Sequence, residues 1–211
     1  MNTNKNIDLD NLTDEELIEL YSKRKDIRVA HHLWCRTHND IPINFSGEFV
    51  KLLNKIEVLN DSRSIKFPNK EMLLNCLIDS IYMDCRGLFC ENESKSRSEN
   101  YTLQNCLKKA NLDGAVVEIN EIIKNKKFTD NIVKEFSFWG WVKLVTDKSI
   151  AHKDSITNEN VGLINYRHNF LMNIFNLIEF QTYIYQIHEI YEQVVKDFGE
   201  NIIRNNYSPK D

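Results

Sequence analysis

The side chains best suited to chemistry are concentrated in one short segment, residues 141–155, which reads WVKLVTDKSIAHKDS. Lys148 and His152 stand four residues apart, so an α-helix would place them on the same face. A neighbouring ammonium favours the neutral imidazole, which is a base that works near pH 7. Asp147 and Asp154 flank the pair. The segment is therefore a candidate site for proton transfer.

The same residues also have a purely structural interpretation. The C-terminal end of a helix attracts Lys and His side chains through its dipole, without any catalysis, and the spacing alone favours this role. The sequence has no glycine loop for phosphates, no GxSxG or HExxH motif, and no Cys or His spacing suited to zinc. We therefore predict neither a cofactor nor a metal.

The composition predicts that these side chains are positioned by helices alone. The 211 residues include only 6 Gly and 3 Pro, well below the roughly 7% and 5% of average usage. Sheet-rich folds need these residues in their tight turns. Hydrophobic residues make up 42% and charged residues 27% of the chain, which excludes a wholly disordered protein.

Apolar residues recur at helical spacing over most of the chain. Thr13 and Glu16 form a capping box before a long first helix that we expect to end near Asn39. Further helical patterns cover residues 46–59, 69–91, 102–123, 129–150 and 161–198, and Asp113 with Gly114 interrupts the pattern of 102–123. The pattern predicts an all-α, up-and-down bundle of about six or seven helices. We expect a single domain over residues 13–200, with a flexible N-terminal tail (1–12) and a C-terminal tail (201–211).

Charge and targeting signals limit the expected environment. A formal net charge of -4 argues against a surface that binds nucleic acid everywhere, although residues 102–153 carry nine Lys against six acidic residues. The sequence shows no signal-peptide pattern and no apolar run long enough to span a membrane. Five Cys without a CxxC pair are typical of reduced thiols. We predict a cytoplasmic protein with no membrane contact.

The segment DKSIAHKDS resembles the hallmark of the HEPN superfamily (higher eukaryotes and prokaryotes nucleotide-binding), specifically its AbiU-like abortive-infection branch. There a helix ends in the pattern Arg-Asp-Lys-x-Ile-Ala-His-x-Asp. The matching residues are Asp147, Lys148, Ile150, Ala151, His152 and Asp154. Upstream, Arg86 and Leu88 fit a second helix of this branch, with Cys90 where Asp is common. The resemblance covers residues 17–198 as an all-helical layout.

This resemblance implies a function. Active HEPN proteins cleave RNA without a metal ion, in the cleft of a dimer, as part of toxin-antitoxin or phage-defence systems. Their signature is an Arg followed, after four to six residues, by a His. The His acts as general base or acid, and the Arg stabilises the charge of the phosphorane. By this resemblance His152 is the acid or base, Lys148 and Arg86 face the phosphate, and Asp154 orients them.

The chain departs from the signature at the Arg. The three positions where it should stand before His152 hold Asp147, Thr146 and Val145. Lys148 is the nearest cation, but it is one residue too close and lacks the planar fork of a guanidinium. Either Lys148 or the remote Arg86 therefore substitutes for the missing Arg, or catalysis has been lost.

Three interpretations stay open. The chain is a HEPN-type ribonuclease, a catalytically degenerate HEPN-like module that binds a protein or nucleotide partner, or a helical scaffold with neither role. The expected partners are a second copy of the chain, RNA in a small cleft, and an antitoxin or regulatory protein. The last helix carries more aromatic residues than one monomer's core needs: Phe170, Phe175, Phe180, Tyr183, Tyr185 and Tyr191.

Overall fold

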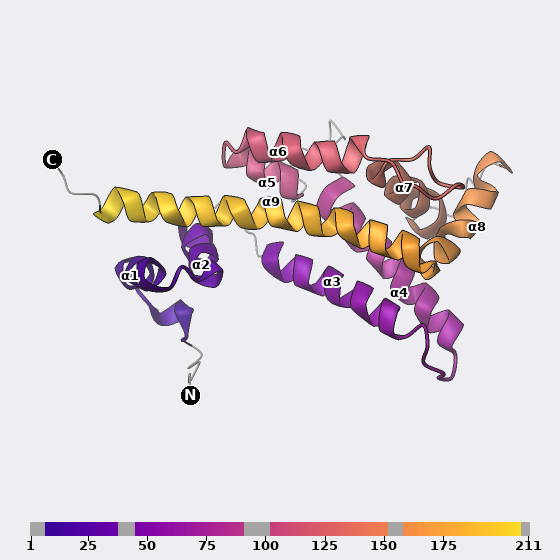
Figure 1. Ribbon diagram of the computed structural model, residues 1–211, viewed down its shortest axis with the longest axis horizontal. Helices are drawn as coiled ribbons and strands as arrows, with labels where there is room; N and C mark the ends of the chain where they lie inside the picture. The colour runs from indigo at the N-terminus through magenta and orange to yellow at the C-terminus, as the bar shows by residue number, and fades with distance from the viewer. Residues whose placement is uncertain (1–6, 38–44, 91–101, 152–157, 208–211) are drawn as a thin grey trace. The chain divides into compact units, whose positions relative to one another are not determined.

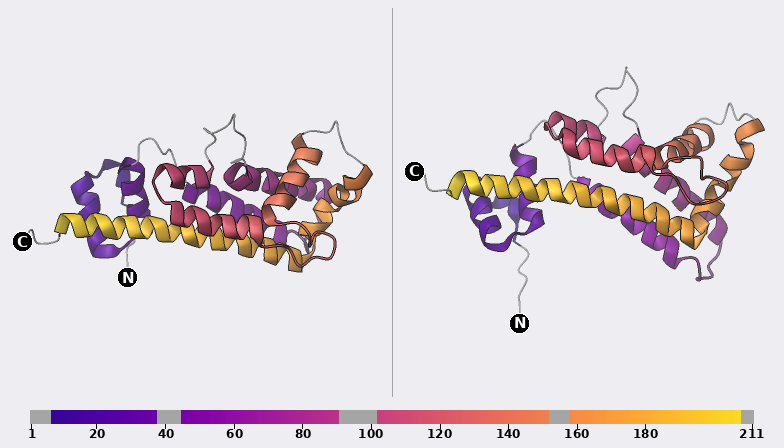
Figure 2. Two further views of the ribbon diagram at one scale, coloured as in Figure 1. Left: turned by 90° about the horizontal axis from the view of Figure 1, so that it is seen from above. Right: turned by 45° about the horizontal axis from the view of Figure 1, so that its top comes forward.

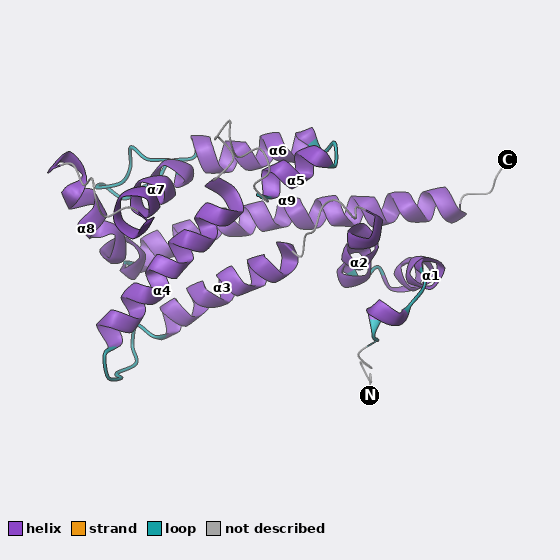
Figure 3. Ribbon diagram, turned by 180° about the vertical axis from the view of Figure 1, so that it is seen from behind, coloured by secondary structure: helices purple, strands orange, loops and turns teal. Residues whose placement is uncertain are grey.

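The computed structural model describes residues 7–37, 45–90, 102–151 and 158–207 (Figure 1). These ranges form nine α-helices and contain no strand, as Figure 3 shows. The predicted all-α fold class is therefore confirmed. Over the same ranges, no helix combines the length and the apolar character that crossing a membrane requires.

The described helices gather into two compact units, each with its own core. The smaller unit belongs to residues 1–44 and 189–211, and the larger unit to residues 45–188. Helix α9 (Ile174–Tyr207) contributes its first part to the larger unit and its second part to the smaller one. The nine helices exceed the predicted six or seven because two predicted long helices are each interrupted.

The smaller unit consists of α1 (Asp14–Arg24), α2 (Ile27–Thr37) and the second part of α9. The capping box that the sequence predicts at the start of α1 is confirmed. The hydroxyl oxygen of Thr13 accepts a hydrogen bond from the Glu16 N–H at 3.2 Å, and the Glu16 carboxylate accepts one from the Thr13 N–H at 2.8 Å. These bonds satisfy two of the amides that a helix start leaves unpaired.

The prediction of one long first helix is wrong. The chain leaves the helix at Lys25, whose φ of 50° is left-handed and ends α1. The carboxylate of Asp26 then accepts a hydrogen bond from the Arg28 N–H at 3.0 Å. An Asp in this place favours a new helix start, so the aspartate divides a continuous apolar pattern into two helices.

Short parts of both predicted tails have helical structure. Within the predicted N-terminal tail, residues 9–11 form a short 3-10 turn. Arg36 holds this turn, because its guanidinium donates hydrogen bonds to the carbonyl oxygens of Leu9, Asp10 and Leu12. At the other end, α9 continues to Tyr207, beyond the predicted start of the C-terminal tail.

The core of the smaller unit depends on a close approach between α1 and the second part of α9. The Tyr21 hydroxyl donates a hydrogen bond to the Lys196 carbonyl at 3.4 Å, and the Trp34 and Phe198 rings meet edge to face with centroids 5.0 Å apart. A Cβ at Gly199 would lie 2.6 Å from the Tyr21 ring. Glycine is therefore required at position 199 by this contact.

Gly199→Ala should lower the free energy of unfolding by about 1–3 kcal/mol, because the added methyl overpacks the Tyr21 ring. Gly162→Ala is the matched control, since Gly162 is also helical and has open space around it. That change should stabilise the protein by about 0.5–1 kcal/mol through helix propensity. Thermal and urea unfolding measure both effects, and equal shifts in the two variants would contradict the contact.

The larger unit packs six helices with the first part of α9 (Figure 2). Helices α3 and α4 lie side by side, and α5 packs against α6. The six helices are α3 (Phe45–Asp61), α4 (Lys70–Cys85), α5 (Leu103–Lys109), α6 (Asp113–Asn120), α7 (Phe138–Val145) and α8 (Asn158–Met172).

Aromatic rings fill the core of the larger unit. Phe138 and Phe180 have ring centroids 4.9 Å apart, and Trp141 meets Phe170 edge to face at 5.5 Å. All four side chains are fully buried. Burial of such rings removes large apolar areas from water, and their pairing adds about 0.5–1.5 kcal/mol for each contact. Much of the aromatic run that the sequence shows on its last helices is therefore core.

One polar connection crosses this aromatic core. The buried hydroxyl of Tyr82, on α4, accepts a hydrogen bond from Nε1 of Trp141 on α7 at 3.1 Å. The same hydroxyl donates to the Arg167 carbonyl oxygen on α8, also at 3.1 Å. Burial raises the pKa of Tyr82 well above its usual range. The phenol therefore stays neutral and links three helices at one atom.

Two further helix predictions in the larger unit are corrected. Residues 129–137 are not helical: Asp130 accepts the Ile132 N–H at 2.9 Å to make a turn, and α7 begins only after Ser137, whose hydroxyl accepts the Gly140 N–H. The last predicted helix is interrupted at Asn173, whose side chain accepts the Phe175 N–H at 2.9 Å. In both places a short polar side chain forms a hydrogen bond with the backbone and interrupts the predicted helix, although the apolar spacing continues.

Candidate functional site

The predicted site residues lie on two segments of the larger unit. Arg86 follows α4 directly and begins η2, a π-helical turn over Arg86–Cys90. Asp147 and Lys148 lie in η4, a second π-helical turn over Thr146–Ala151 that follows α7. His152 and Asp154 lie outside the described residues.

The structure brings Arg86 and Asp147 together across 61 residues of sequence. One guanidinium nitrogen, Nη1, forms an ion pair with Oδ1 of Asp147 and donates a hydrogen bond to Oγ1 of Thr146 at 3.0 Å. The Arg86 side chain is only 15% exposed and that of Asp147 is 33% exposed. The two charges therefore compensate one another in a partly shielded place, where an unpaired charge would be costly.

Thr146 belongs to this contact although it carries no charge. Its side chain is fully buried, and its hydroxyl donates a hydrogen bond to the Val142 carbonyl oxygen at 2.8 Å. The hydroxyl oxygen then accepts the bond from Arg86. The contact therefore brings a guanidinium from the end of α4 to two neighbouring residues, Thr146 and Asp147, that carry no cation themselves.

Helix α4 positions Arg86 through Tyr82, which lies one turn earlier on the same helix face. Tyr82 binds Trp141, and Trp141 lies on α7, which leads directly into η4. Contacts also join α4 to η4. The aromatic core therefore sets the distance between the two polar segments.

Both segments are π-helical. The prediction that Lys148 and His152 share a helix face involves His152, which lies outside the described residues. Lys148 is half-buried and makes no ion pair with any residue in the described ranges.

A second polar cluster, which the sequence does not predict, lies between α4 and α8. Oδ1 of Asp79 accepts hydrogen bonds from Nε of Arg167 at 3.1 Å and from Nε2 of His168 at 2.9 Å. Burial raises the pKa of Asp79, but the hydrogen bonds from His168 and Arg167 outweigh it and hold the pKa below its ordinary value. The carboxylate is therefore ionised, and it fixes the orientation of the imidazole.

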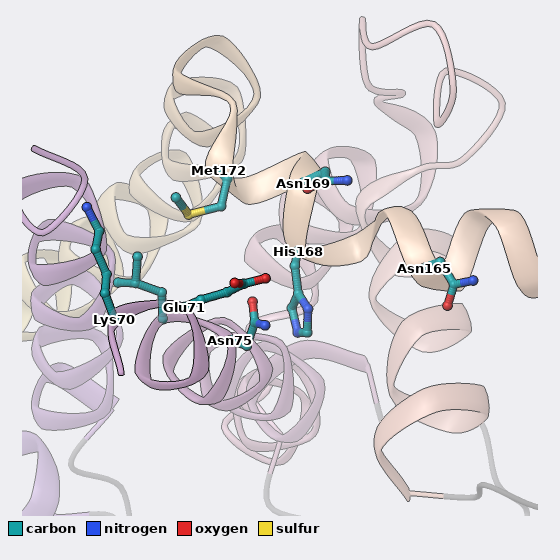
Figure 4. Close-up of a pocket in the computed structure, with 8 residues that line it drawn as sticks. Lys70, Glu71, Asn75, Asn165, His168, Asn169 and Met172 are labelled. Atoms are coloured by element: carbon teal, nitrogen blue, oxygen red, sulfur yellow. The ribbon is translucent and has the colours of Figure 1, made fainter. Parts of the chain in front are cut away.

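A pocket of about 550 Å³ lies beside this cluster (Figure 4). It is lined by residues of α4 and α8: Lys70, Glu71, Leu74, Asn75, Asn165, His168, Asn169 and Met172. Its volume lies in the range of small-molecule sites. The sequence signal for it is weak, because its two halves are about ninety residues apart and neither carries a recognised motif.

Among the described residues, no group of three or more His, Cys, Asp or Glu side chains is arranged to hold a metal ion. Comparison of the chain with protein-family models, with curated proteins and with solved structures gives no match. The described residues therefore form an all-α protein with two polar clusters. One lies at the end of α4, and the other lies between α4 and α8.

Asp79→Asn should lower the free energy of unfolding at neutral pH by about 1–3 kcal/mol, because Arg167 and His168 both lose their ionised hydrogen-bond acceptor. Since the pKa of Asp79 is lowered on folding, its stabilisation is present above the unfolded pKa and is lost as the pH falls through the folded pKa. The difference between wild type and variant should therefore shrink below about pH 4.

Urea unfolding between acid and neutral pH measures this difference. Asp61→Asn is the control, because the Asp61 carboxylate is exposed and has no partner among the described side chains. A variant at Asp79 whose stability differs from wild type by the same amount at every pH would contradict the coupling.

Proposed function

We propose that the chain is a HEPN-type ribonuclease that cleaves RNA without a metal ion, in which Arg86 supplies the cation that the signature lacks. The observation that carries this proposal is the contact of the Arg86 guanidinium with Thr146 and Asp147. It brings a permanent cation with a planar fork to the residues that precede His152 in the sequence, and such a cation is suited to bind phosphate oxygens.

In the proposed reaction, the ribose 2′-hydroxyl loses its proton and attacks the adjacent phosphorus. The bond from phosphorus to the 5′-oxygen breaks, and that oxygen takes up a proton. His152 transfers one of these two protons as general base or general acid. The phosphorane between these steps carries additional negative charge, which the guanidinium of Arg86 stabilises. Lys148 adds positive charge on the same segment, and Asp154 is the proposed orienting group.

The second candidate function is a catalytically degenerate module that binds a protein or nucleotide partner. The observation in its favour is the carboxylate of Asp147, which already compensates the charge of Arg86. A guanidinium held in this way stabilises the packing of α4 against η4 whether or not RNA is present. The two functions differ in whether the cation also meets a phosphate.

His152→Ala should reduce RNA cleavage by at least about 10²-fold, because general acid–base catalysis contributes about that much. Arg86→Ala should cause a loss of similar size through the transition-state charge, with partial recovery in Arg86→Lys. The assay uses purified full-length protein, a labelled single-stranded RNA and EDTA. His32→Ala is the control, since His32 belongs to the smaller unit.

Each outcome of this assay separates the candidates. Cleavage that survives in His152→Ala rules out this site as the catalytic one. No cleavage by the wild-type protein on any RNA favours the binding module, and pull-down of a protein or nucleotide by the wild type but not by Arg86→Ala would then support it.

The proposal includes a homodimer, because an RNA cleft between two copies needs one. The first part of α9 exposes apolar side chains along the helix, with Phe175 79% exposed and Ile178 52% exposed. Ile174 and Tyr185 are exposed on the same helix. Apolar groups of this kind on a helix surface are suited to a self-complementary interface.

Phe175→Ser should weaken self-association by about tenfold or more, since an exposed aromatic ring is a frequent anchor of an interface. Sedimentation equilibrium over a range of protein concentrations measures the dissociation constant. Val117→Ser is the matched control, because Val117 is 67% exposed on α6. A wild-type protein that stays monomeric, or equal weakening by both substitutions, would contradict an interface at Phe175.

A further inference from the structure

The pocket between α4 and α8 has a centre made of three polar side chains. Glu71, Asn75 and His168 point toward one another in Figure 4, whereas the amino group of Lys70 points away from them. The Lys70 amino group is instead used locally, because it donates a hydrogen bond to the Arg63 carbonyl oxygen. The three central side chains therefore define what the pocket can bind.

These three side chains offer hydrogen-bond acceptors. The Glu71 carboxylate and the Asn75 amide have no hydrogen-bond partner among the described residues. Nε2 of His168 bonds to the carboxylate of Asp79. Because an ionised carboxylate only accepts hydrogen bonds, Nε2 carries the proton of this bond, and Nδ1 is the ring nitrogen that remains for another partner. A carboxylate, an amide carbonyl and an imidazole nitrogen are thus available together.

A primary ammonium group is the complement of this arrangement. It has three N–H donors, no acceptor and a positive charge, so each donor can meet one acceptor while Glu71 balances the charge. Leu74 is buried in the wall of the pocket, and the thioether of Met172 lies across from the polar centre in Figure 4. These two side chains give an apolar surface for the methylene groups of an alkylamine.

The acceptor-rich surface continues along α4 beyond this pocket. A neighbouring, more open depression of about 600 Å³ shares Glu71 and Asn75 and adds Asn69 and Asp79. Glu71 and Asp79 are eight residues apart on one helix, which is about 12 Å along its axis. An elongated amine held at Glu71 can therefore extend along the helix into this second depression, where the charge of Asp79 is already balanced by Arg167.

We propose that this pocket binds an aliphatic polyamine, with Glu71, Asn75 and His168 holding a terminal ammonium group. Leu74 and Met172 contact its methylene chain. The site is separate from the contact between Arg86 and Asp147, and the proposal does not depend on ribonuclease activity.

Isothermal titration of the full-length protein with spermidine tests the site. The wild type should show saturable binding of one spermidine per chain, and Glu71→Gln should weaken it by about tenfold, which corresponds to about 1.4 kcal/mol. Glu118→Gln, an exposed carboxylate on α6, is the matched control and should bind as the wild type does. Because Glu71 is exposed, its substitution leaves the core intact.

Three results would overturn the proposal. These are no saturable binding of spermidine, equal losses in Glu71→Gln and Glu118→Gln, and competition by Mg²⁺ at equal charge concentration, which would indicate unspecific attraction of cations.

Substitution of His168 tests its part in the site. His168→Gln should weaken the binding of spermidine several-fold, because an imidazole acceptor is lost, and thermal unfolding checks that the variant is folded. Binding as strong as that of the wild type would exclude His168 from the site.

Discussion

The buried hydroxyl of Tyr82 is the interaction on which both polar clusters depend. It accepts a hydrogen bond from Trp141 on α7 and donates one to the Arg167 carbonyl on α8. A buried polar atom without partners is costly, so this hydroxyl restricts how α4, α7 and α8 can pack. Asp79 lies three residues before Tyr82 on the same face of α4, and Arg86 follows Tyr82 by four residues, directly after the helix ends.

The two clusters follow the same electrostatic rule. Each contains a mostly buried guanidinium that a carboxylate of another helix compensates: Arg86 with Asp147, and Arg167 with Asp79. The carboxylates remain more exposed than the guanidinium groups. A substitution that removes one partner leaves the other charge uncompensated in a shielded place. It therefore lowers the free energy of unfolding by more than the intact ion pair contributes to it. Experiments on function therefore need stability measurements on the same variants.

The fold class was predictable because it depends on composition and local pattern. The scarcity of Gly and Pro indicated helices, and Thr13 with Glu16 marked a helix start that the structure confirms. The interruptions at Lys25 and Asn173 were not predicted, because the apolar periodicity continues across them and a single side chain decides each one.

The candidate site was predictable only in part. Arg86 and Asp147 were each identified from residues that resemble a family pattern, but their ion pair spans 61 residues, and no local pattern reports such a contact. The partners Asp79 and His168 are 89 residues apart and were missed for the same reason. Their sequence signal is weak, because other polar residues such as Glu71 and Asn75 precede Asp79 on α4 and nothing in the sequence distinguishes it from them.

The π-helical turns at Arg86–Cys90 and Thr146–Ala151 have a consequence for the comparison of sequences. Each such turn holds one residue more than an α-helical turn, as if a single amino acid had been inserted without displacing the helix ends. A related chain with ordinary α-turns in these places would present the same side chains with one residue fewer between them. A motif defined by a fixed number of intervening residues would therefore separate proteins whose sites coincide in space.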